Sequence, residues 1–307
     1  MSFVPCFAAA GLVTLSLATL QAEPRCPGNV SSLSLRPVQG VLIVVRVEIN
    51  HTGPYDFMVD TGSQFTSIDP ALAAKLHLNI EGTTGVSGVL THSRSGYGYL
   101  DLIEAGDHSV PNVLAVIQDI SEFQAADPRI RGILGQSFLS HFDLLIDNRQ
   151  QILCLDELSA LAHAVRGEHI PLMPPRGSQD DLPFTRPMIV SARITTAAAI
   201  PVLLRLDSGS AALVLYDVPP RLLKASANPA SFFKRVVNGA EQAFAVLPAQ
   251  DIVLGSTPEH KVPFVVPMNA VGGGPSPRED GMLPTIAFAH VFISYSHHYA
   301  VFDPWLR

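Results

Sequence analysis

The sequence has 307 residues, of which 47% are apolar and 15% are charged. This balance allows a sizeable buried core and excludes a disordered chain, and the length suits two lobes of about 140 residues each. The net charge of −7 comes without blocks of like charge, so the sequence offers no basic surface for nucleic acid.

The N-terminus carries an apolar run from Phe3 to Leu20, followed by the small residue Ala22. This pattern is typical of a secretory signal peptide, so we predict cleavage after residue 22 and a periplasmic or secreted protein. The alternative is an uncleaved membrane anchor, because no Lys or Arg precedes the run. No second stretch reaches the roughly 20 apolar residues that span a bilayer, so we expect no membrane contact after cleavage.

Two cysteines would remain in the mature chain, Cys26 and Cys154. An even pair in an oxidising compartment favours a disulfide that ties the N-terminal segment to the end of the first half. The alternative is two thiols, with Cys154 buried in the core.

The first half is predicted to begin with a β-hairpin. Residues 41–49 and 55–60 are rich in β-branched and other apolar residues, and Gly and Pro lie in the turn between them. The second strand runs directly into the tetrapeptide Asp60-Thr61-Gly62-Ser63.

Further elements follow in the first half. Residues 69–78 predict a short helix, with Asp69 as N-cap and Pro70 in the first turn. The tetrapeptide Gly132-Ile133-Leu134-Gly135 begins 72 residues after Asp60, since 132 minus 60 is 72. It leads into alternating apolar runs at 142–147 and 151–155, which predict another hairpin.

The second half repeats these features. Strands are predicted at 188–194 and 202–206, and the second runs into Asp207-Ser208-Gly209-Ser210, which lies 147 residues after the first motif (207 minus 60). Gly281-Met282-Leu283-Pro284 begins 74 residues after Asp207 (281 minus 207) and precedes a predicted hairpin at 291–295 and 299–302. A helix over 217–224 would match the helix of the first half. Two landmarks at matched spacing indicate an internally duplicated, all-β protein.

The residues between the halves predict a linker. Residues 166–185 contain several prolines and an acidic pair, a mixture that breaks helices and strands. The predicted organisation is therefore a signal peptide at 1–22, an N-terminal lobe at 23–165, the linker at 166–185 and a C-terminal lobe at 186–307.

The repeated aspartates predict a paired-carboxylate site. Two carboxylates about 3 Å apart cannot both ionise, so Asp60 and Asp207 would share one proton. The charged group can activate a water while the protonated group hydrogen-bonds a substrate carbonyl, which is the chemistry of amide hydrolysis without a metal. For one copy alone the ordinary alternative is a turn, because Asp and Ser bond their own backbone.

The neighbours of each aspartate fit this site. In each tetrapeptide, we expect the glycine to let backbone N–H groups approach the carboxylates. We expect the residue after each aspartate to form hydrogen bonds across the lobe junction, and the last serine to donate its hydroxyl to an outer carboxylate oxygen. These supporting residues are Gly62 and Gly209, Thr61 and Ser208, and Ser63 and Ser210.

On these motifs the chain resembles the pepsin–retropepsin superfamily of aspartic peptidases, and most closely bacterial exported members with two retropepsin-like halves. The matching segments are 57–63 with 132–135, and 206–210 with 281–283. The resemblance implies two β-barrel lobes, an active-site cleft between them and a flap over the cleft.

The flap implied by the resemblance falls on the Gly-rich segment 82–88, with its tip at Gly85, Val86, Ser87 and Gly88. The alternative for this segment is a plain mobile loop. In the second half, residues 238–239 (Asn-Gly) signal a tight turn in the corresponding region.

Three departures from the family pattern bear on substrate range and turnover. Pro284 replaces the expected glycine, Ser208 replaces the commoner Thr, and neither Tyr97 nor Tyr99 matches the flap tyrosine of pepsin-like enzymes. The pair His297-His298 has no further ligand at metal spacing and is interpreted as a solvated turn.

The sequence thus predicts a monomeric aspartic endopeptidase that cuts peptides or unfolded chains and needs no metal and no cofactor. The alternative is a catalytically weak or inactive bilobal protein of the cell envelope that binds peptides or regulates a partner.

Overall fold

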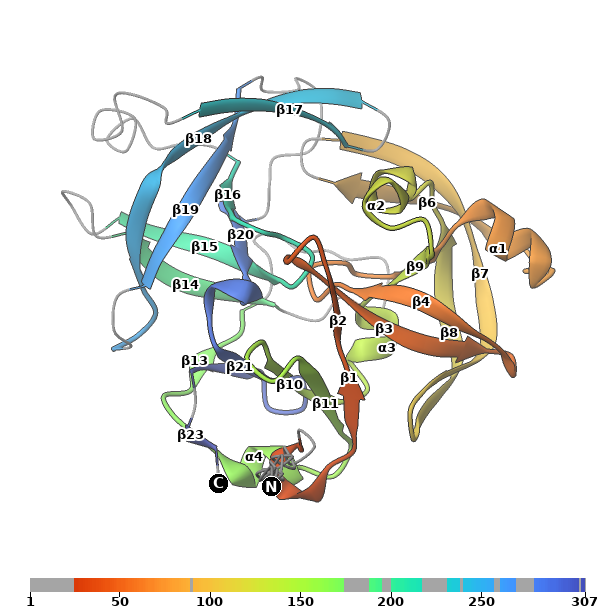
Figure 1. Ribbon diagram of the computed structural model, residues 1–307, viewed down its shortest axis with the longest axis horizontal. Coiled ribbons are helices and arrows are strands. Elements are labelled where there is room, and N and C mark those ends of the chain that lie inside the picture. The colour runs from red at the N-terminus through yellow and green to blue at the C-terminus, as the bar shows by residue number, and fades with distance from the viewer. Residues whose placement is uncertain are drawn as a thin grey trace, which may run out of the picture.

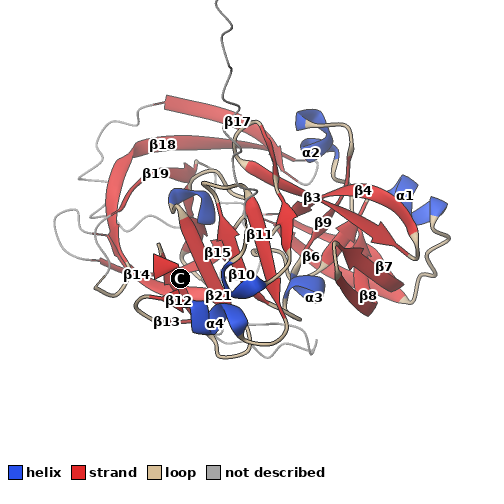
Figure 2. Cartoon of the chain, turned by 60° about the horizontal axis from the view of Figure 1, so that its bottom comes forward, coloured by secondary structure: helices blue, strands red, loops and turns tan. Residues whose placement is uncertain are grey.

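Sheets of β-strands make up most of the computed structural model, which describes residues 25–88, 91–173, 188–194, 200–216, 231–237, 240–256, 260–268, 279–303 and 305–306 (Figure 1). Figure 2 shows that the helices between the strands are short. The predicted all-β class is confirmed. In the described part of the chain, no helix is long and apolar enough to span a membrane. The predicted signal peptide, the helix over 217–224, the 238–239 turn and most of the linker lie outside the described residues.

The first lobe is an eight-stranded sheet in the order β2-β3-β4-β9-β5-β8-β7-β6. The hairpin predicted at its start is confirmed, because β3 and β4 pair in antiparallel fashion. The predicted turn is wrong, however, because Gly53 and Pro54 lie in β4 and the chain turns at Asn50 and His51, which both have positive φ. Strand β9 pairs parallel to β4 and so carries the Gly132 landmark alongside the strand that leads to Asp60. The strands are β2 (Arg36–Val38), β3 (Leu42–Ile49), β4 (Thr52–Val59), β5 (Thr66–Ile68), β6 (Gly82–Gly88), β7 (Thr91–Ala105), β8 (His108–Ile117) and β9 (Ile130–Leu134).

The second lobe is a seven-stranded sheet in the order β14-β15-β20-β16-β19-β18-β17. It repeats the plan of the first lobe, because β20 pairs parallel to β15 just as β9 pairs parallel to β4. The registers also match, with Leu206 opposite Leu283 and Val59 opposite Leu134. The strands are β14 (Ile189–Ile194), β15 (Ile200–Asp207), β16 (Leu213–Leu215), β17 (Ser231–Val237), β18 (Ala240–Val253), β19 (His260–Pro267) and β20 (Gly281–Pro284).

A third sheet joins the halves in the order β1-β11-β10-β21-β22-β13. It contains both of the later hairpins that the sequence predicted. The sequence did not predict that β10 of one half pairs with β21 of the other. The strands are β1 (Ser32–Ser34), β10 (Asp143–Asp147), β11 (Ile152–Asp156), β13 (Ile170–Pro171), β21 (His290–Ser294) and β22 (Tyr299–Phe302), and the short strands β12 (Val165–Arg166) and β23 (Trp305–Leu306) pair separately.

Part of the segment predicted as linker is in fact strand. Within its described part, β13 pairs with β22, with Pro171 opposite Tyr299. Strand β13 lies at the edge of the third sheet, where a proline is tolerated because its missing N–H faces away from the ladder. The domain boundaries at 165 and 186 remain a prediction.

The helix predicted at 69–78 is confirmed as α1 (Pro70–Lys75). The Asp69 carboxylate caps it by accepting a hydrogen bond of 2.9 Å from Leu72 N, and Pro70 occupies the first turn. The remaining described helices were not predicted, since each spans only a few residues. They are α2 (Ser121–Ala126), α3 (Gln136–Leu139), α4 (Ala160–Ala164), and the 3-10 turns η1 (Pro27–Asn29) and η2 (Thr285–Ala287).

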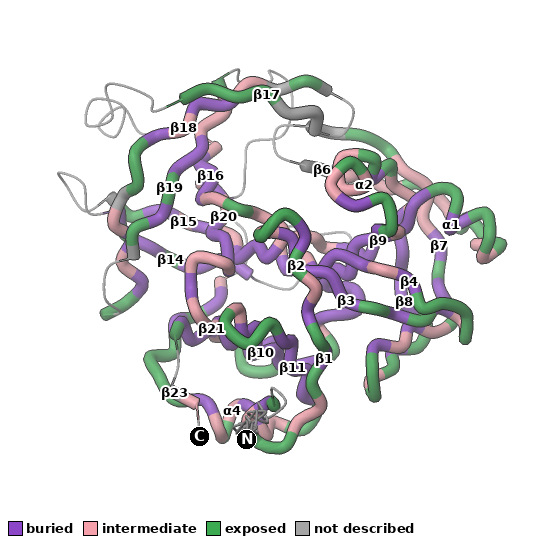
Figure 3. The backbone as a smooth tube through the Cα atoms, in the orientation of Figure 1, coloured by how far each residue is buried: buried purple, intermediate pink, exposed green. Residues whose placement is uncertain are grey.

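One apolar core runs through all three sheets (Figure 3). It contains the fully buried side chains of Phe57 in the first lobe, Leu204 in the second, and Leu144 and Ile293 in the sheet between them. Because close-packed interiors hold their elements in fixed positions, this shared core sets how the two aspartate loops meet.

Candidate active site

Asp60 follows the last residue of β4, where the strand leaves the core. Met58 and Val59 before it are fully buried, and Asp60 N donates to Leu134 O of β9 at 3.1 Å. The carboxylate Oδ1 accepts hydrogen bonds from Gly62 N at 2.8 Å and from Ser63 N at 3.2 Å. The turn after the strand therefore fixes this carboxylate by backbone groups.

Asp207 occupies the matching place at the end of β15. Leu204 and Leu206 before it are fully buried, and Asp207 itself is 6% exposed. Its Oδ1 accepts a hydrogen bond of 2.7 Å from Gly209 N. The expectation that each glycine lets a backbone N–H approach a carboxylate is met in both halves.

The two carboxyl groups lie against each other and share a hydrogen bond. The glycines show how close the loops are. A Cβ added to Gly62 would lie 2.9 Å from Asp207 Cγ, and one added to Gly209 would lie 3.1 Å from Asp60 Cγ. Each glycine thus leaves room for the carboxyl group of the opposite half.

Thr61 and Ser208 connect the two loops below the carboxyl groups. Thr61 N donates to Ser208 Oγ at 3.0 Å, and Ser208 N donates to Thr61 Oγ1 at 3.1 Å. The two hydroxyls then donate across the junction, Thr61 Oγ1 to Leu206 O at 3.0 Å and Ser208 Oγ to Val59 O at 2.8 Å. The predicted bonds across the lobe junction are present as four buried hydrogen bonds.

The role predicted for the hydroxyls of Ser63 and Ser210 is wrong. Ser63 Oγ donates to Phe65 O at 2.9 Å, and Ser210 Oγ donates to Ala212 O at 2.8 Å. Because a hydroxyl has one proton to donate, neither can also donate to a carboxylate. These serines instead stabilise the turn that leads into the next strand.

Gln136 is a neighbour of the site that the sequence did not single out. It follows the Gly132–Gly135 landmark directly and is fully buried in α3. Its Nε2 donates to Thr61 O at 3.0 Å, and its backbone N donates to Ser63 O at 2.9 Å. The position of Gln136 directly after a matched landmark was the available signal.

The Pro284 departure is accommodated by a second difference between the halves. In the first lobe Gly135 N donates to Thr66 Oγ1 at 3.3 Å. In the second lobe Pro284 has no N–H and Leu213, at the position of Thr66, has no hydroxyl, so donor and acceptor are lost together.

Burial and mutual repulsion change the acidity of the pair. The pKa of Asp207 is raised well above its ordinary value, first by desolvation and then by the negative charge of Asp60. Desolvation also raises the pKa of Asp60, against the hydrogen bonds that it accepts from Gly62, Asp207 and Ser63. The site therefore favours retention of a proton at a pH where an exposed carboxyl group would have lost it.

The segment predicted as a flap tip is a strand. Residues 82–88 form β6 and pair with β7 in continuous register, with Gly85 opposite Arg94 and Gly88 opposite Thr91. The turn of this hairpin, at 89–90, lies outside the described residues. The side chains of Val86 and Tyr97 pack against the cluster that contains Phe65, which follows the loop of Asp60. A covering role for this hairpin, including Ser87, remains a prediction.

Cys26 and Cys154 form a disulfide with a Cα–Cα distance of 5.8 Å. The bond lies against Leu145 and Phe292 in a cluster beneath the third sheet. It ties the N-terminal segment to β11, as the sequence analysis proposed.

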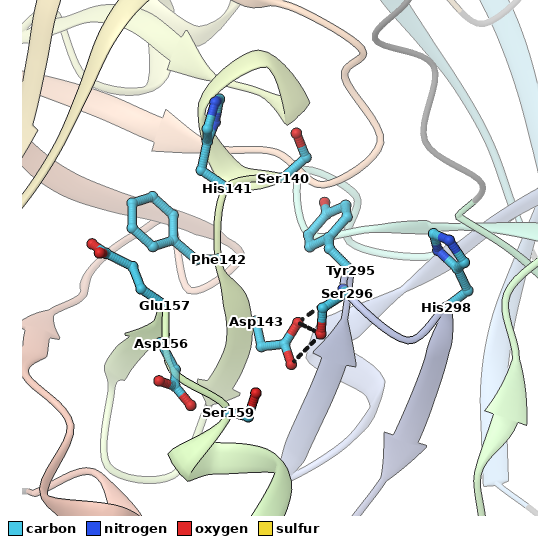
Figure 4. A pocket seen from close by; sticks show the side chains of 10 residues that line it. All are labelled: Ser140, His141, Phe142, Asp143, Asp156, Glu157, Ser159, Tyr295, Ser296 and His298. Atoms are coloured by element: carbon cyan, nitrogen blue, oxygen red, sulfur yellow. Dashed lines mark hydrogen bonds between the residues drawn. The ribbon is translucent and has the colours of Figure 1, made fainter.

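A separate pocket of about 270 Å³ lies at the ends of β10, β11 and β21 and contains neither aspartate of the pair (Figure 4). Asp143, one of its two buried carboxylates, accepts hydrogen bonds from Ser294 Oγ and Ser296 N at 3.0 and 3.1 Å. These contacts bind the β21–β22 turn, which contains His297-His298, to the first half. Among the described residues no group of three or more His, Cys, Asp or Glu side chains is placed to hold a metal ion.

Comparison with known proteins finds a family resemblance over part of the chain. Residues 45–138, which include Asp60 and the Gly132 landmark, match the sequence profile of a family described as aspartyl protease. A solved structure of a retropepsin-like aspartic protease from Rickettsia conorii shares 19% identity, over 41% of this chain and 90% of that chain, with a TM-score of 0.32. No curated protein matches the chain.

Proposed function

We propose that the chain is an aspartic endopeptidase whose catalytic residues are Asp60 and Asp207, and the match of residues 45–138 to the aspartyl protease family supports this. The observation that carries this proposal is the contact between the two carboxyl groups, each at the end of a buried strand and each fixed by a backbone N–H.

The proposed reaction uses the single proton of the pair. Asp60 accepts two backbone N–H bonds, which favour its charged form, whereas burial and the charge of Asp60 favour a proton on Asp207. Asp60 takes a proton from a water as the water oxygen bonds to the peptide carbonyl carbon. Asp207 donates a hydrogen bond to the carbonyl oxygen as negative charge develops there.

The second step restores the pair. The tetrahedral intermediate expels the amine when its carbon–nitrogen bond breaks, and the nitrogen leaves with the proton that Asp60 had taken. The products are a carboxylic acid and an amine, and the pair again holds one proton. The buried bonds between Thr61 and Ser208 keep the carboxyl groups in place throughout.

The substrate and setting follow from the same proposal. Peptides or unfolded chains are the substrates, and one chain suffices because it supplies both carboxyl groups. A periplasmic or secreted location is supported by the disulfide, since disulfides persist in oxidising compartments.

The test is cleavage of a denatured protein by the purified chain from acidic to neutral pH, beside Asp60→Asn and Asp207→Asn. We expect products from the parent and none from either variant, with equal amounts of folded protein confirmed by circular dichroism. Tight peptide binding by the parent without any product would contradict the peptidase proposal and support the alternative of a peptide-binding or regulatory protein.

A further inference from the structure

The two halves differ at the residue two positions before each aspartate. Met58 holds this position in β4, and Arg205 holds it in β15. Residues two apart in a strand project from the same face, so each side chain lies on the face of the sheet that carries its aspartate. Matched pairings confirm the equivalence, because Met58 lies opposite Ile133 and Arg205 lies opposite Met282.

The contact partners differ in the same way. Met58 and Ile130 belong to one apolar cluster in the first lobe. The position of Ile130, two residues before Gly132, is taken in the second lobe by Glu279, two residues before Gly281. Glu279 forms a two-pronged ion pair with Arg205, with Nε–Oε1 at 3.0 Å and Nη2–Oε2 at 3.1 Å. An apolar contact in one half is thus an ion pair in the other.

The ion pair is well removed from solvent. The side chains of Arg205 and Glu279 are 12% and 10% exposed. A buried ion pair rarely adds stability over apolar residues of similar volume, because both charges lose their hydration. The first lobe demonstrates that this fold accepts apolar residues at both positions. Stability alone therefore does not explain the pair.

We propose that Arg205, held in place by Glu279, is a positioning residue for the carboxyl pair. It sets a fixed positive charge beside Asp207, whereas Met58 holds the matching position beside Asp60. The charge biases the two carboxyl groups toward holding a single proton. This role rests on the proposed peptidase function.

The other charged and titratable groups around the pair are few in the described part of the chain. The Arg205 charge acts to lower the pKa of both aspartates, against desolvation and against their mutual repulsion. Tyr216, which follows β16, interacts with Glu279, Arg205 and Asp207, and burial raises its pKa further above its ordinary value, so it stays neutral. Among the described residues, Arg205 is thus a cation whose charge acts on both carboxyl groups.

Single variants are expected to move the pH dependence of cleavage in opposite directions. Arg205→Met leaves the Glu279 charge, so both limbs of the pH profile should move up by roughly one pH unit. Glu279→Gln leaves Arg205 without its counter-charge, so both limbs should move down. Opposite shifts would not arise from general damage to the fold, which lowers activity at every pH.

The double variant Arg205→Met/Glu279→Ile guards against misfolding, because it copies the residues of the first lobe. We expect it to fold and to show an upward shift smaller than that of Arg205→Met, since the nearer charge is lost with its partner. Identical profiles for the parent and the double variant would overturn the proposal. A double variant that fails to fold would also overturn it, because the pair would then be a structural requirement.

A second readout separates this proposal from the peptidase proposal. Thermal unfolding from pH 3 to 8, with and without Asp207→Asn, measures how the charge of Asp207 affects stability without any need for cleavage. Relative to the matching Asp207→Asn variant, stability is lost with rising pH from the unfolded pKa up to the folded pKa of Asp207, and in the double-variant background this loss should end at a higher pH. An unchanged upper end of this pH range would overturn the role of Arg205, whether or not the parent cleaves peptides.

Discussion

Thr61 and Ser208 bond each other reciprocally, backbone N–H to side-chain oxygen, at 3.0 and 3.1 Å, although they lie 147 residues apart in the chain. Both are buried, at 0% and 3% exposure. Each hydroxyl oxygen accepts a hydrogen bond from a backbone N–H of the other half's loop. Each hydroxyl also donates a hydrogen bond to a carbonyl of the other half, Thr61 to Leu206 O and Ser208 to Val59 O. The two aspartate loops are therefore held as one unit.

Thr61→Val tests this unit. The substitution keeps the shape but leaves Leu206 O and Ser208 N without the Thr61 hydroxyl, and unsatisfied buried groups cost about 1–3 kcal/mol each. We expect the free energy of unfolding in urea to fall by about 2–4 kcal/mol. Thr83→Val on the exposed face of β6 is the control, with an expected change within about 0.5 kcal/mol. Equal losses of unfolding free energy in Thr61→Val and Thr83→Val would contradict the view that the Thr61–Ser208 hydrogen bonds hold the two loops together.

Gly62→Ala tests the closeness of the carboxyl groups. The added Cβ would lie 2.9 Å from Asp207 Cγ, nearer than packed atoms tolerate, so the carboxyl groups must move apart. We expect kcat to fall at least about tenfold, because small displacements of catalytic groups are costly. Gly96→Ala in β7, where the nearest atom is 3.5 Å away, should leave kcat unchanged. Full activity of the Gly62 variant would mean that the pair needs no such contact.

Asp207→Asn should change stability in a pH-dependent way. The folded-state pKa of Asp207 is raised, so the folded protein holds more protons than the unfolded chain between the two pKa values. The contribution of Asp207 is complete below the unfolded value of about 3.9 and is lost as the pH rises through the folded value. Thermal melts should therefore show the melting temperature of the variant rising relative to that of the parent between pH 4 and 8. A difference that is constant with pH would refute the raised pKa.

The Cys26–Cys154 disulfide closes a loop of 128 residues in sequence separation. A cross-link over so long a loop restricts the unfolded chain, and its removal typically costs about 2–5 kcal/mol. We expect the free energy of unfolding in urea to fall by this amount in the variant with Ser at both positions. Mass spectrometry should find both cysteines of the oxidised parent alkylated only after reduction. Alkylation without a reductant would show that the bond is absent.

Local patterns in the sequence were sufficient for much of the fold. The β3–β4 hairpin follows from two runs rich in β-branched and other apolar residues, although the turn lies at 50–51 rather than at Gly53-Pro54, and α1 follows from Asp69 and Pro70 at its start. The pairing of Asp60 with Asp207 follows from the repeat, because duplicated halves place equivalent residues at a common junction.

Long-range contacts could not be predicted in this way. The pairing of β10 with β21 joins hairpin edges from the two halves of the chain, which no local pattern specifies. The segment around Pro171 was predicted as linker because proline breaks strands. Proline is excluded only from strand positions that need a backbone N–H donor, and the edge strand β13 has a position that does not. The hydroxyls of Ser63 and Ser210 were misassigned because a turn offers them nearer carbonyls than the carboxylates do. The Arg205–Glu279 ion pair joins residues 74 positions apart that carry no motif.

The most direct test of the central claim is a carbon-13 titration of the aspartate carboxyl groups, assigned with Asp60→Asn and Asp207→Asn. In the parent we expect the Asp207 signal to titrate above the ordinary range near 4, and its midpoint to fall when Asp60 is replaced, because the neighbouring charge is gone. If both signals titrate near 4 and neither responds to loss of the other residue, the two carboxyl groups do not share a proton.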